Sequence, residues 1–188
     1  LSEIIFLDRD RVEVKFLNKM KESSKPSNIE LAICLVKKNP MEIILQKATE
    51  LGVSRITPII SERTEVKELN YERAQKIVIE ATEQSNQLNP PEVTKVIKLK
   101  DFLEKLDSGS KFLFADVNSQ NNLQKKDVDG DALKIILIGP EGDFSPGERE
   151  SILAKANTTS FSISKNILRS DTAVISAISL VNFINNLH

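Results

Sequence analysis

The chain has 188 residues, of which 40% are hydrophobic and 28% charged, and this composition is typical of a globular protein with one substantial core. Its net charge of −1 and its lack of Trp give no sign of a bulk electrostatic or aromatic platform for nucleic acid. With one Cys and one His, the terminal His188, the sequence excludes a His/Cys zinc site and Ser-His-Asp or Cys-His catalysis.

The first residues predict a β-hairpin. Two apolar runs within residues 3–17 flank an Asp-Arg-Asp turn. A polar, turn-rich stretch follows at residues 18–28, which is typical of a linker. Residues 29–36, "IELAICLV", then predict a fully buried strand, in which Cys34 is expected to be a small buried hydrophobe rather than a reactive thiol.

Residues 39–52 predict a helix whose start and stop are visible in the sequence. Asn39 fits the N-cap, Pro40 the first turn, Glu42 the capping-box position and Gly52 the C-terminal stop. A β-rich run and a second helix follow, at residues 54–60 and 70–88.

The second half alternates between strands and helices. The last two helices have start signals: Ser145 with Glu148 forms a capping box, and Ser170 or Asp171 fits the cap of the final helix. Apolar strands that alternate with helices predict an α/β fold with a parallel sheet covered on both faces. The elements expected here are a short helix at 101–106, a strand at 111–117, an exposed loop at 118–131, a strand at 132–139, a helix at 145–157, a strand at 158–164 and a final helix at 169–187.

The loop "IGPEGDFSPGE", which follows the strand at 132–139, concentrates glycines in a glycine-poor chain. Ligands of parallel sheets bind at the carboxyl ends of strands, so the loop is a candidate ligand site. Gly139 and Gly142 are expected to adopt positive φ and to let the backbone approach an adenine-like ring. The loop has no phosphate-binding glycine motif. A tight turn with solvated acids is the alternative, and composition leaves both interpretations open.

Two more stretches have a functional and an ordinary interpretation. In "SISKNILRSDTA", Arg169 lies at a helix start, where the macrodipole disfavours a cation, so either Asp171 or an anionic ligand compensates it. In "EATEQSNQLNPP", the amides of Gln84, Asn86 and Gln87 suit either the edge of a base or the end of a helix.

These stretches, in this order and after "QKATELGVSRITPIISERT", resemble one family. It is the ribosomal small-subunit methyltransferase E family of the SPOUT superfamily, whose members make 3-methyluridine in 16S ribosomal RNA. The motifs "KATELGV", "SERT", "EQS", "GPEGDFS-x-x-E" and "ILRSDTA" carry the resemblance, which runs from about residue 29 to the C-terminus.

The resemblance implies an S-adenosyl-L-methionine-dependent methyltransferase of the cytoplasm that acts on 16S ribosomal RNA or the small ribosomal subunit. It implies a homodimer without a membrane partner, and a sheet whose C-terminal part is threaded into a trefoil knot. Residues 1–22 would be the C-terminal remnant of a PUA-like β-barrel, 23–28 a linker and 29–188 the methyltransferase domain. The chain is therefore expected to be a fragment.

The resemblance also assigns roles to residues. Arg169 would stabilise charge on a uracil oxygen while Glu141 or Asp171 acts as base or orienting group. No metal is expected. Cofactor contacts are expected from the loop after residue 138 and from the segment that leads into the last helix: Ile138, Gly139, Pro140, Gly142, Ile163, Asn166, Leu168 and Thr172. RNA contacts are expected from Lys47, Arg63 and Gln84.

The sequence departs from the family pattern at several positions. Where the family usually has Gly-Gly this chain has Gly142-Asp143, and where it usually has Gly or Cys and then Arg this chain has Asn86 and Gln87. Asn166 replaces an arginine. Two alternatives therefore accompany the methyltransferase hypothesis: a catalytically impaired knotted protein that binds RNA or cofactor, and a different nucleotide-using α/β enzyme, which should prefer ATP or a dinucleotide.

Overall fold

The structure is a computed structural model that describes residues 1–18 and 27–186, so the linker predicted at 23–28 and His188 fall wholly or largely outside the described residues. The N-terminal hairpin is confirmed, with β1 (Ser2–Leu7) antiparallel to β2 (Val12–Phe16). Its apolar side chains are exposed; Phe16, for example, is 85% exposed.

The main sheet has seven strands in the order β5-β4-β3-β8-β7-β9, with β6 also pairing with β4. Every pairing within it is parallel, which confirms the predicted parallel sheet. The strands are β3 (Ile29–Cys34), β4 (Arg55–Ile60), β5 (Glu92–Val93), β6 (Ile97–Lys98), β7 (Lys111–Ala115), β8 (Lys134–Ile138) and β9 (Thr158–Phe161).

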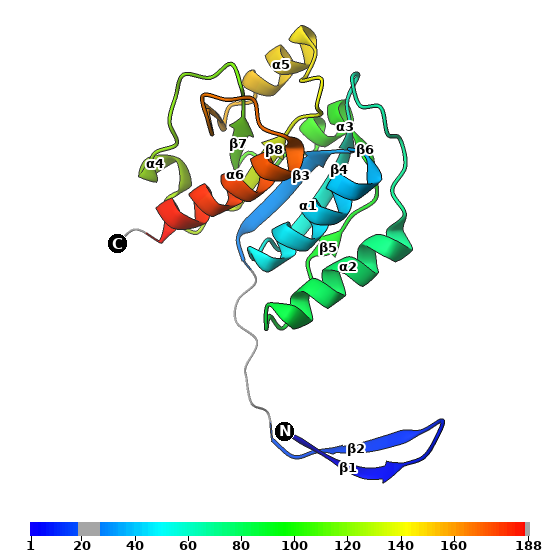
Figure 1. The fold of residues 1–188 in the computed structure, drawn as a ribbon. Helices are drawn as coiled ribbons and strands as arrows, with labels where there is room; N and C mark the ends of the chain where they lie inside the picture. The colour runs from blue at the N-terminus through cyan, green and yellow to red at the C-terminus, as the bar shows by residue number, and fades with distance from the viewer. Residues whose placement is uncertain (19–26, 187–188) are drawn as a thin grey trace.

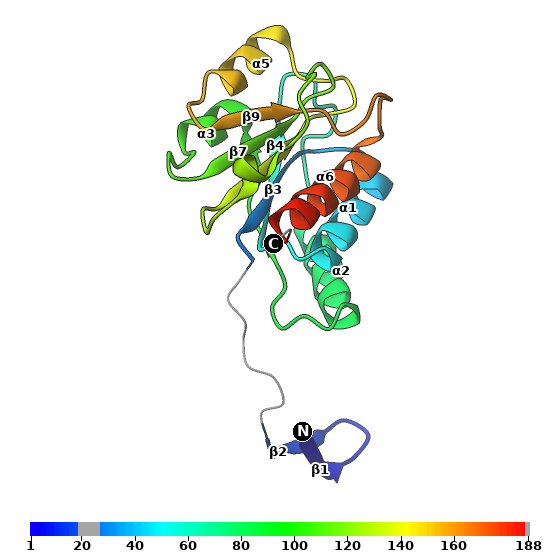
Figure 2. The ribbon, with the colours of Figure 1, turned by 90° about the vertical axis from the view of Figure 1, so that its left-hand side faces the viewer.

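Helices cover both faces of this sheet, as predicted (Figures 1 and 2). One face carries α1 (Lys38–Glu50), α2 (Tyr71–Gln84) and α6 (Ser170–Asn185), and the other carries α3 (Leu99–Glu104) and α5 (Pro146–Leu153). A short helix, α4 (Lys125–Val128), lies within the stretch predicted to be an exposed loop, and Val128 is buried beside α6.

Apart from Glu30, the strand β3 is apolar, and its packing shows why. Leu31 and Ile33 belong to the core under α1, α2 and α6, whereas Ala32 and Cys34 belong to the core under α3 and α5. Burial raises the pKa of the Cys34 thiol to about 12. Cys34 is therefore a buried hydrophobe, as predicted, and not a reactive thiolate.

Two predicted helix caps are wrong. The helix α1 begins at Lys38 with Lys37 as its N-cap and no side-chain cap, so Asn39 lies in the first turn. Either start puts Pro40 in the first turn, where its missing N–H costs nothing, so the proline does not choose between them. Glu42 forms an ion pair with Arg73 of α2 at 3.0 Å instead of closing a capping box.

At the start of α6 the N-cap is Arg169, again without a side-chain hydrogen bond, rather than Ser170 or Asp171. In contrast, the capping box of Ser145 and Glu148 at α5 is confirmed. Two long helices on one face of the sheet therefore begin with a cation at the N-cap.

The order in which the chain adds strands to the sheet reverses between β3 and β8, which are parallel, hydrogen-bonded neighbours. Ligands of such sheets bind outside the carboxyl ends of strands at this switch point. The loop that follows β8 and the start of α1 both lie there. Within the described residues, no helix has the length and apolar character needed to cross a bilayer.

Candidate cofactor and substrate site

A cavity of about 340 Å³ lies at the carboxyl ends of β7 and β8. This volume is within the range of small-molecule sites. Three segments that are distant in sequence line it: residues 115–117 after β7, residues 138–143 after β8, and residues 162–173 between β9 and the first turn of α6. Figure 1 shows these connections gathered at one end of the sheet.

The loop after β8 is held in a tight turn, but its glycines do not adopt positive φ as predicted. The left-handed residue is Asp143, with φ of 58°, and its N–H donates to the carbonyl of Pro140 at 3.0 Å. A Cβ at Gly139 would lie 3.0 Å from the ring of Phe144. A side chain at Gly139 would therefore be tight against Phe144, and the role of Gly139 beside a cofactor stays a prediction.

Residues 61–64, "SERT", which follow β4, brace this loop from the other side of β3. The guanidinium of Arg63 donates to the carbonyl of Gly142 at 3.0 Å. Glu148 accepts from the N–H of Glu62 at 2.8 Å and from that of Ser145 at 3.1 Å. The structure thus gives Arg63 a role in shaping the cavity wall, and its predicted contact with RNA stays a prediction.

Asp116, at the end of β7, connects three elements beside the cavity. Its side chain is fully buried and accepts from Arg149 of α5 at 2.6 Å. It also accepts from the hydroxyl of Ser160 at 3.1 Å and from the N–H of Asn118 at 2.9 Å. Burial alone would raise the pKa of Asp116, but these hydrogen bonds and the charge of Arg149 outweigh it and lower the pKa.

The third wall is the segment 162–169, which belongs neither to the sheet nor to a helix. The N–H of Ser162 donates to the carbonyl of Asn121 at 2.8 Å, and the hydroxyl of Ser119 donates to the carbonyl of Ser160 at 3.1 Å. The segment is thereby fixed under the loop that follows β7. Ile163 and Leu168 supply apolar surface to the cavity.

A second cleft of about 640 Å³ adjoins the first, and Glu141 and Ser170 line both. It brings together the three predicted catalytic residues, Arg169, Glu141 and Asp171. Arg169 is 79% exposed at its side chain, and its Nε lies 3.9 Å from Asp171 Oδ1, which is too far for a hydrogen bond. Its guanidinium is therefore available to a substrate.

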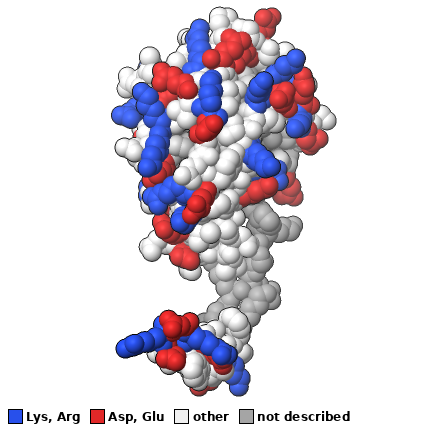
Figure 3. Space-filling model, turned by 90° about the vertical axis from the view of Figure 1, so that its right-hand side faces the viewer, with Lys and Arg blue, Asp and Glu red and all other residues white. Residues whose placement is uncertain are grey.

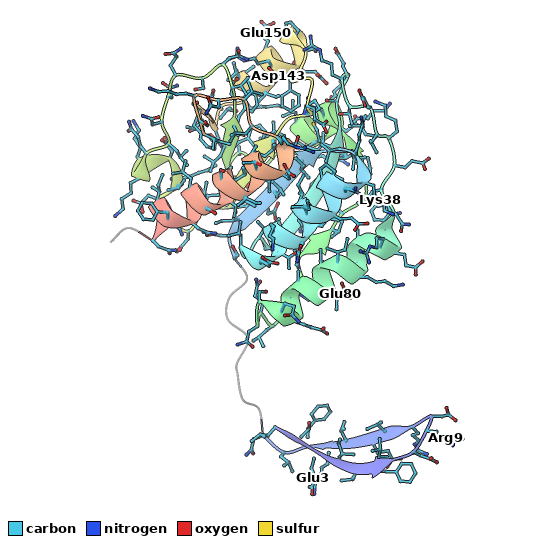
Figure 4. All side chains as sticks on the ribbon, viewed as in Figure 1. Glu3, Arg9, Lys38, Glu80, Asp143 and Glu150 are labelled. Atoms are coloured by element: carbon cyan, nitrogen blue, oxygen red, sulfur yellow. The ribbon has the colours of Figure 1, made fainter. Side chains whose placement is uncertain are left out.

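Seven of the eight predicted cofactor residues line the smaller cavity; the exception is Thr172, whose N–H donates to its neighbour Asp171. The structure does not bring Lys47 and Gln84 to either cavity. Lys47 pairs with Glu50 at 2.8 Å in the last turn of α1, and Gln84 ends α2 in the groove between these helices. In Figure 4, Lys38 marks the opposite end of α1.

Sequence reasoning missed Asp116 and its neighbours after β7, and it favoured a solvated face for Lys37 and Lys38, which line the second cleft. Their position directly after apolar strands was the available signal. No group of three or more His, Cys, Asp or Glu side chains that could hold a metal ion occurs within residues 1–18 and 27–186.

The family model for an RNA methyltransferase domain matches residues 22–182. Ribosomal RNA small subunit methyltransferase E of Rickettsia conorii is 31% identical over 99% of this chain and 77% of its own length, and that of Aquifex aeolicus is 33% identical over 94% and 78%. The chain belongs to the ribosomal RNA small subunit methyltransferase E family. A solved structure of the family's enzyme from Neisseria gonorrhoeae, bound to S-adenosyl methionine, matches with a TM-score of 0.87 at 30% identity. The match covers 98% of this chain and 78% of the other.

Membership of this family gives meaning to the unusual residues of the chain. The two non-glycine residues with positive φ within the described part are Asn86 at 54° and Asp143 at 58°. The resemblance led us to expect Gly or Cys at position 86 and Gly at position 143. Asn and Asp tolerate this conformation better than other side chains. These two replacements therefore preserve the local backbone.

Gln87, which stands where the family pattern has Arg, has a structural role. Its side-chain amide donates to the carbonyl of Thr49 at 2.6 Å, at the C-terminal end of α1, and to the hydroxyl of Ser85 at 3.0 Å. It lies at the end of the sheet away from both cavities. Gln87 therefore lines neither cavity.

Asp143→Gly is expected to leave the free energy of unfolding within about 1 kcal/mol, since glycine adopts the same φ. Asp143→Val is expected to cost about 1–3 kcal/mol, because a β-branched residue is strained there. Urea unfolding of both variants measures the difference. Equal stability of the two would show that the left-handed turn is not needed.

Proposed function

We propose that this chain is an S-adenosyl-L-methionine-dependent methyltransferase that methylates N3 of a uridine in 16S ribosomal RNA. The observation that carries the proposal is the junction of the two cavities. A small cavity with largely apolar walls meets, at Glu141 and Ser170, a wider cleft that presents Arg169 and Asp171. A cofactor in the first and a base at the edge of the second would be adjacent.

The residues of the smaller cavity suit this cofactor. Ile138, Ile163 and Leu168 offer apolar surface for an adenosyl group, and the backbone of residues 139–143 and 162–168 offers hydrogen-bonding groups. The carboxylates Glu141 and Asp143 favour a cationic sulfonium and disfavour a triphosphate. The related enzyme that was solved with S-adenosyl methionine supports the same choice.

Bound cofactor would supply an electrophilic methyl group: the N3–C bond forms as the S–C bond breaks, and the N3 proton leaves. The chain has to align the uracil and to stabilise the negative charge that spreads to its oxygens. Arg169, exposed and without a close partner, is the group for that charge. Glu141 or Asp171 takes or orients the proton; a carboxylate is a weak base for such an acid, so orientation is the larger part.

We infer that the active form is a homodimer. Ile167, 89% exposed in the segment beside the cofactor cavity, and Phe183, 64% exposed on α6, are large apolar side chains without cover. Exposed apolar surface of this kind is typical of an interface. Sedimentation of the purified chain at micromolar concentration tests this, and a monomer would contradict it.

Three further expectations remain part of the proposal. The route of segment 162–169 beneath the loop after β7 supports a trefoil knot, with α6 as the threaded element. The exposed apolar residues of the hairpin support its assignment to a PUA-like barrel at residues 1–22, joined by 23–28 to a methyltransferase domain at 29–188. A ribosomal RNA substrate supports a cytoplasmic location.

The first experiment is a calorimetric titration of the purified chain with S-adenosylhomocysteine, with ATP as the control ligand. Selective binding at about one site per chain supports the proposal. ATP binding in preference would favour a different nucleotide-using enzyme. Cofactor binding without methyl transfer to 16S ribosomal RNA would favour a protein with impaired catalysis.

A further inference from the structure

The wider cleft carries more positive charge than the reaction centre alone requires. Lys37 and Lys38 line the side of the cleft formed by α1, across from Arg169 and Glu141. Both lysines are exposed and follow directly after the buried strand β3, so their position is fixed by the sheet. Figure 4 shows Lys38 in the first turn of α1.

Neither of these two lysines is held in a strong ion pair within the described part of the chain. Lys37 lies 3.8 Å from Glu65, and both side chains are at least 75% exposed, so this pair contributes little. No ion pair of Lys38 occurs among the described residues. In contrast, Lys47, Arg73 and Arg149 are held by acids at 2.8, 3.0 and 2.6 Å.

The described residues on the face shown in Figure 3 form no extended basic area. On the face shown in Figure 3, basic and acidic side chains are interspersed. With a net charge of −1, the chain has to attract a polyanion through a local cluster. The cleft holds three cations, Lys37, Lys38 and Arg169, against two acids, Glu141 and Asp171.

We propose that this cleft is a subsite for a phosphodiester of the RNA backbone next to the target nucleotide, and that Lys37 and Lys38 contact the phosphate. The inference rests on the proposed function, because the target base is taken to lie at Glu141 and Arg169, where the two cavities meet. The strand that carries the base then continues through the cleft past both lysines. Their side chains position the RNA and make no contact with the reacting atoms.

The test compares the salt dependence of binding to transcribed 16S ribosomal RNA for the wild-type chain, Lys37→Gln, Lys38→Gln and the double variant. The slope of log K against log salt is negative. Each lost phosphate contact is expected to make it less steep by about 1, and the double variant is expected to make it less steep by about 2. The matched control is Lys76→Gln with Lys95→Gln, which also removes two exposed charges but touches neither cavity. S-adenosylhomocysteine is titrated into every variant.

The subsite is supported if the slope becomes less steep in the cleft variants and stays unchanged in the control, while all of them bind S-adenosylhomocysteine with equal affinity. An equal slope in wild type and double variant overturns it, as does saturation of the cleft by inorganic phosphate without any change in the RNA slope. Failure of the wild-type chain to bind S-adenosylhomocysteine would instead contradict the proposed function. Cofactor binding with a normal RNA slope in the double variant would contradict this inference alone.

Discussion

Arg169→Ala is expected to reduce the rate of methyl transfer by at least about 100-fold and to leave the affinity for S-adenosylhomocysteine within about twofold. Removal of one donor that stabilises developing negative charge typically costs about 10²–10³ in rate. Arg169 lines the wider cleft, does not line the cofactor cavity, and its side chain forms no cap hydrogen bond at α6. The variant should therefore fold and bind cofactor normally.

The matched control is Lys165→Ala, which removes an exposed cation from the same segment but lines neither cavity. Single-turnover transfer to 16S ribosomal RNA and calorimetry with S-adenosylhomocysteine are measured for both. Arg169→Lys should recover only part of the rate, because an ammonium lacks the planar fork of the guanidinium. Normal transfer by Arg169→Ala would remove Arg169 from the mechanism, and loss of cofactor binding would assign it to the cofactor site.

Much of this architecture is predictable from the sequence because most residues of its central strands are apolar. The run at β8 supplies buried residues to both faces of the sheet, and only a parallel sheet with helices on both sides accommodates that pattern. The same logic places a ligand at the loop after β8. The strand order, with β8 between β3 and β7, depends on long-range packing that local patterns do not contain.

The errors concern local details that distant contacts decide. Glu42 has the spacing of a capping box, yet its carboxylate pairs with Arg73, and this ion pair lowers the pKa of Glu42. Gly139 suggested positive φ, whereas Asp143 adopts it. A sequence shows which residues tolerate a left-handed turn, but Asp143 becomes left-handed only because the loop has to close between β8 and α5.

The functional residues were predicted to different degrees for the same reason. The segment 162–173 and the loop after β8 contain dense motifs, and both line the cavities. Asp116 and Lys37 lie in stretches that look ordinary until the sheet brings them to its carboxyl edge. Lys47 and Gln84 were expected to contact RNA because of their residue types. Their local sequence does not show at which end of the sheet they lie.

Asp116→Asn is expected to lower the free energy of unfolding at pH 7 by about 2–3 kcal/mol. Removal of one partner of a buried ion pair leaves the other charge uncompensated, which typically costs about 3–5 kcal/mol. Because the side chain of Arg149 is 34% exposed, water compensates part of this charge, and the lower figure applies. The variant should also bind S-adenosylhomocysteine more weakly, since Asp116 fixes the end of β7 that lines the cavity.

The pH dependence separates an electrostatic role from simple packing. The pKa of Asp116 is lower in the folded chain than its ordinary value, so the unfolded chain takes up this proton at a higher pH than the folded chain. The stabilisation is therefore complete above about pH 5 and is lost as pH falls through the folded-state pKa, below about pH 4. Urea unfolding of wild type, Asp116→Asn and the exposed α5 control Glu150→Gln, measured from pH 7 to pH 3, should show a gap for Asp116→Asn alone that closes in acid. A gap that stays constant over this range would mean that the carboxylate acts through its shape, and the charge of Arg149 would then have no part in holding the cavity wall.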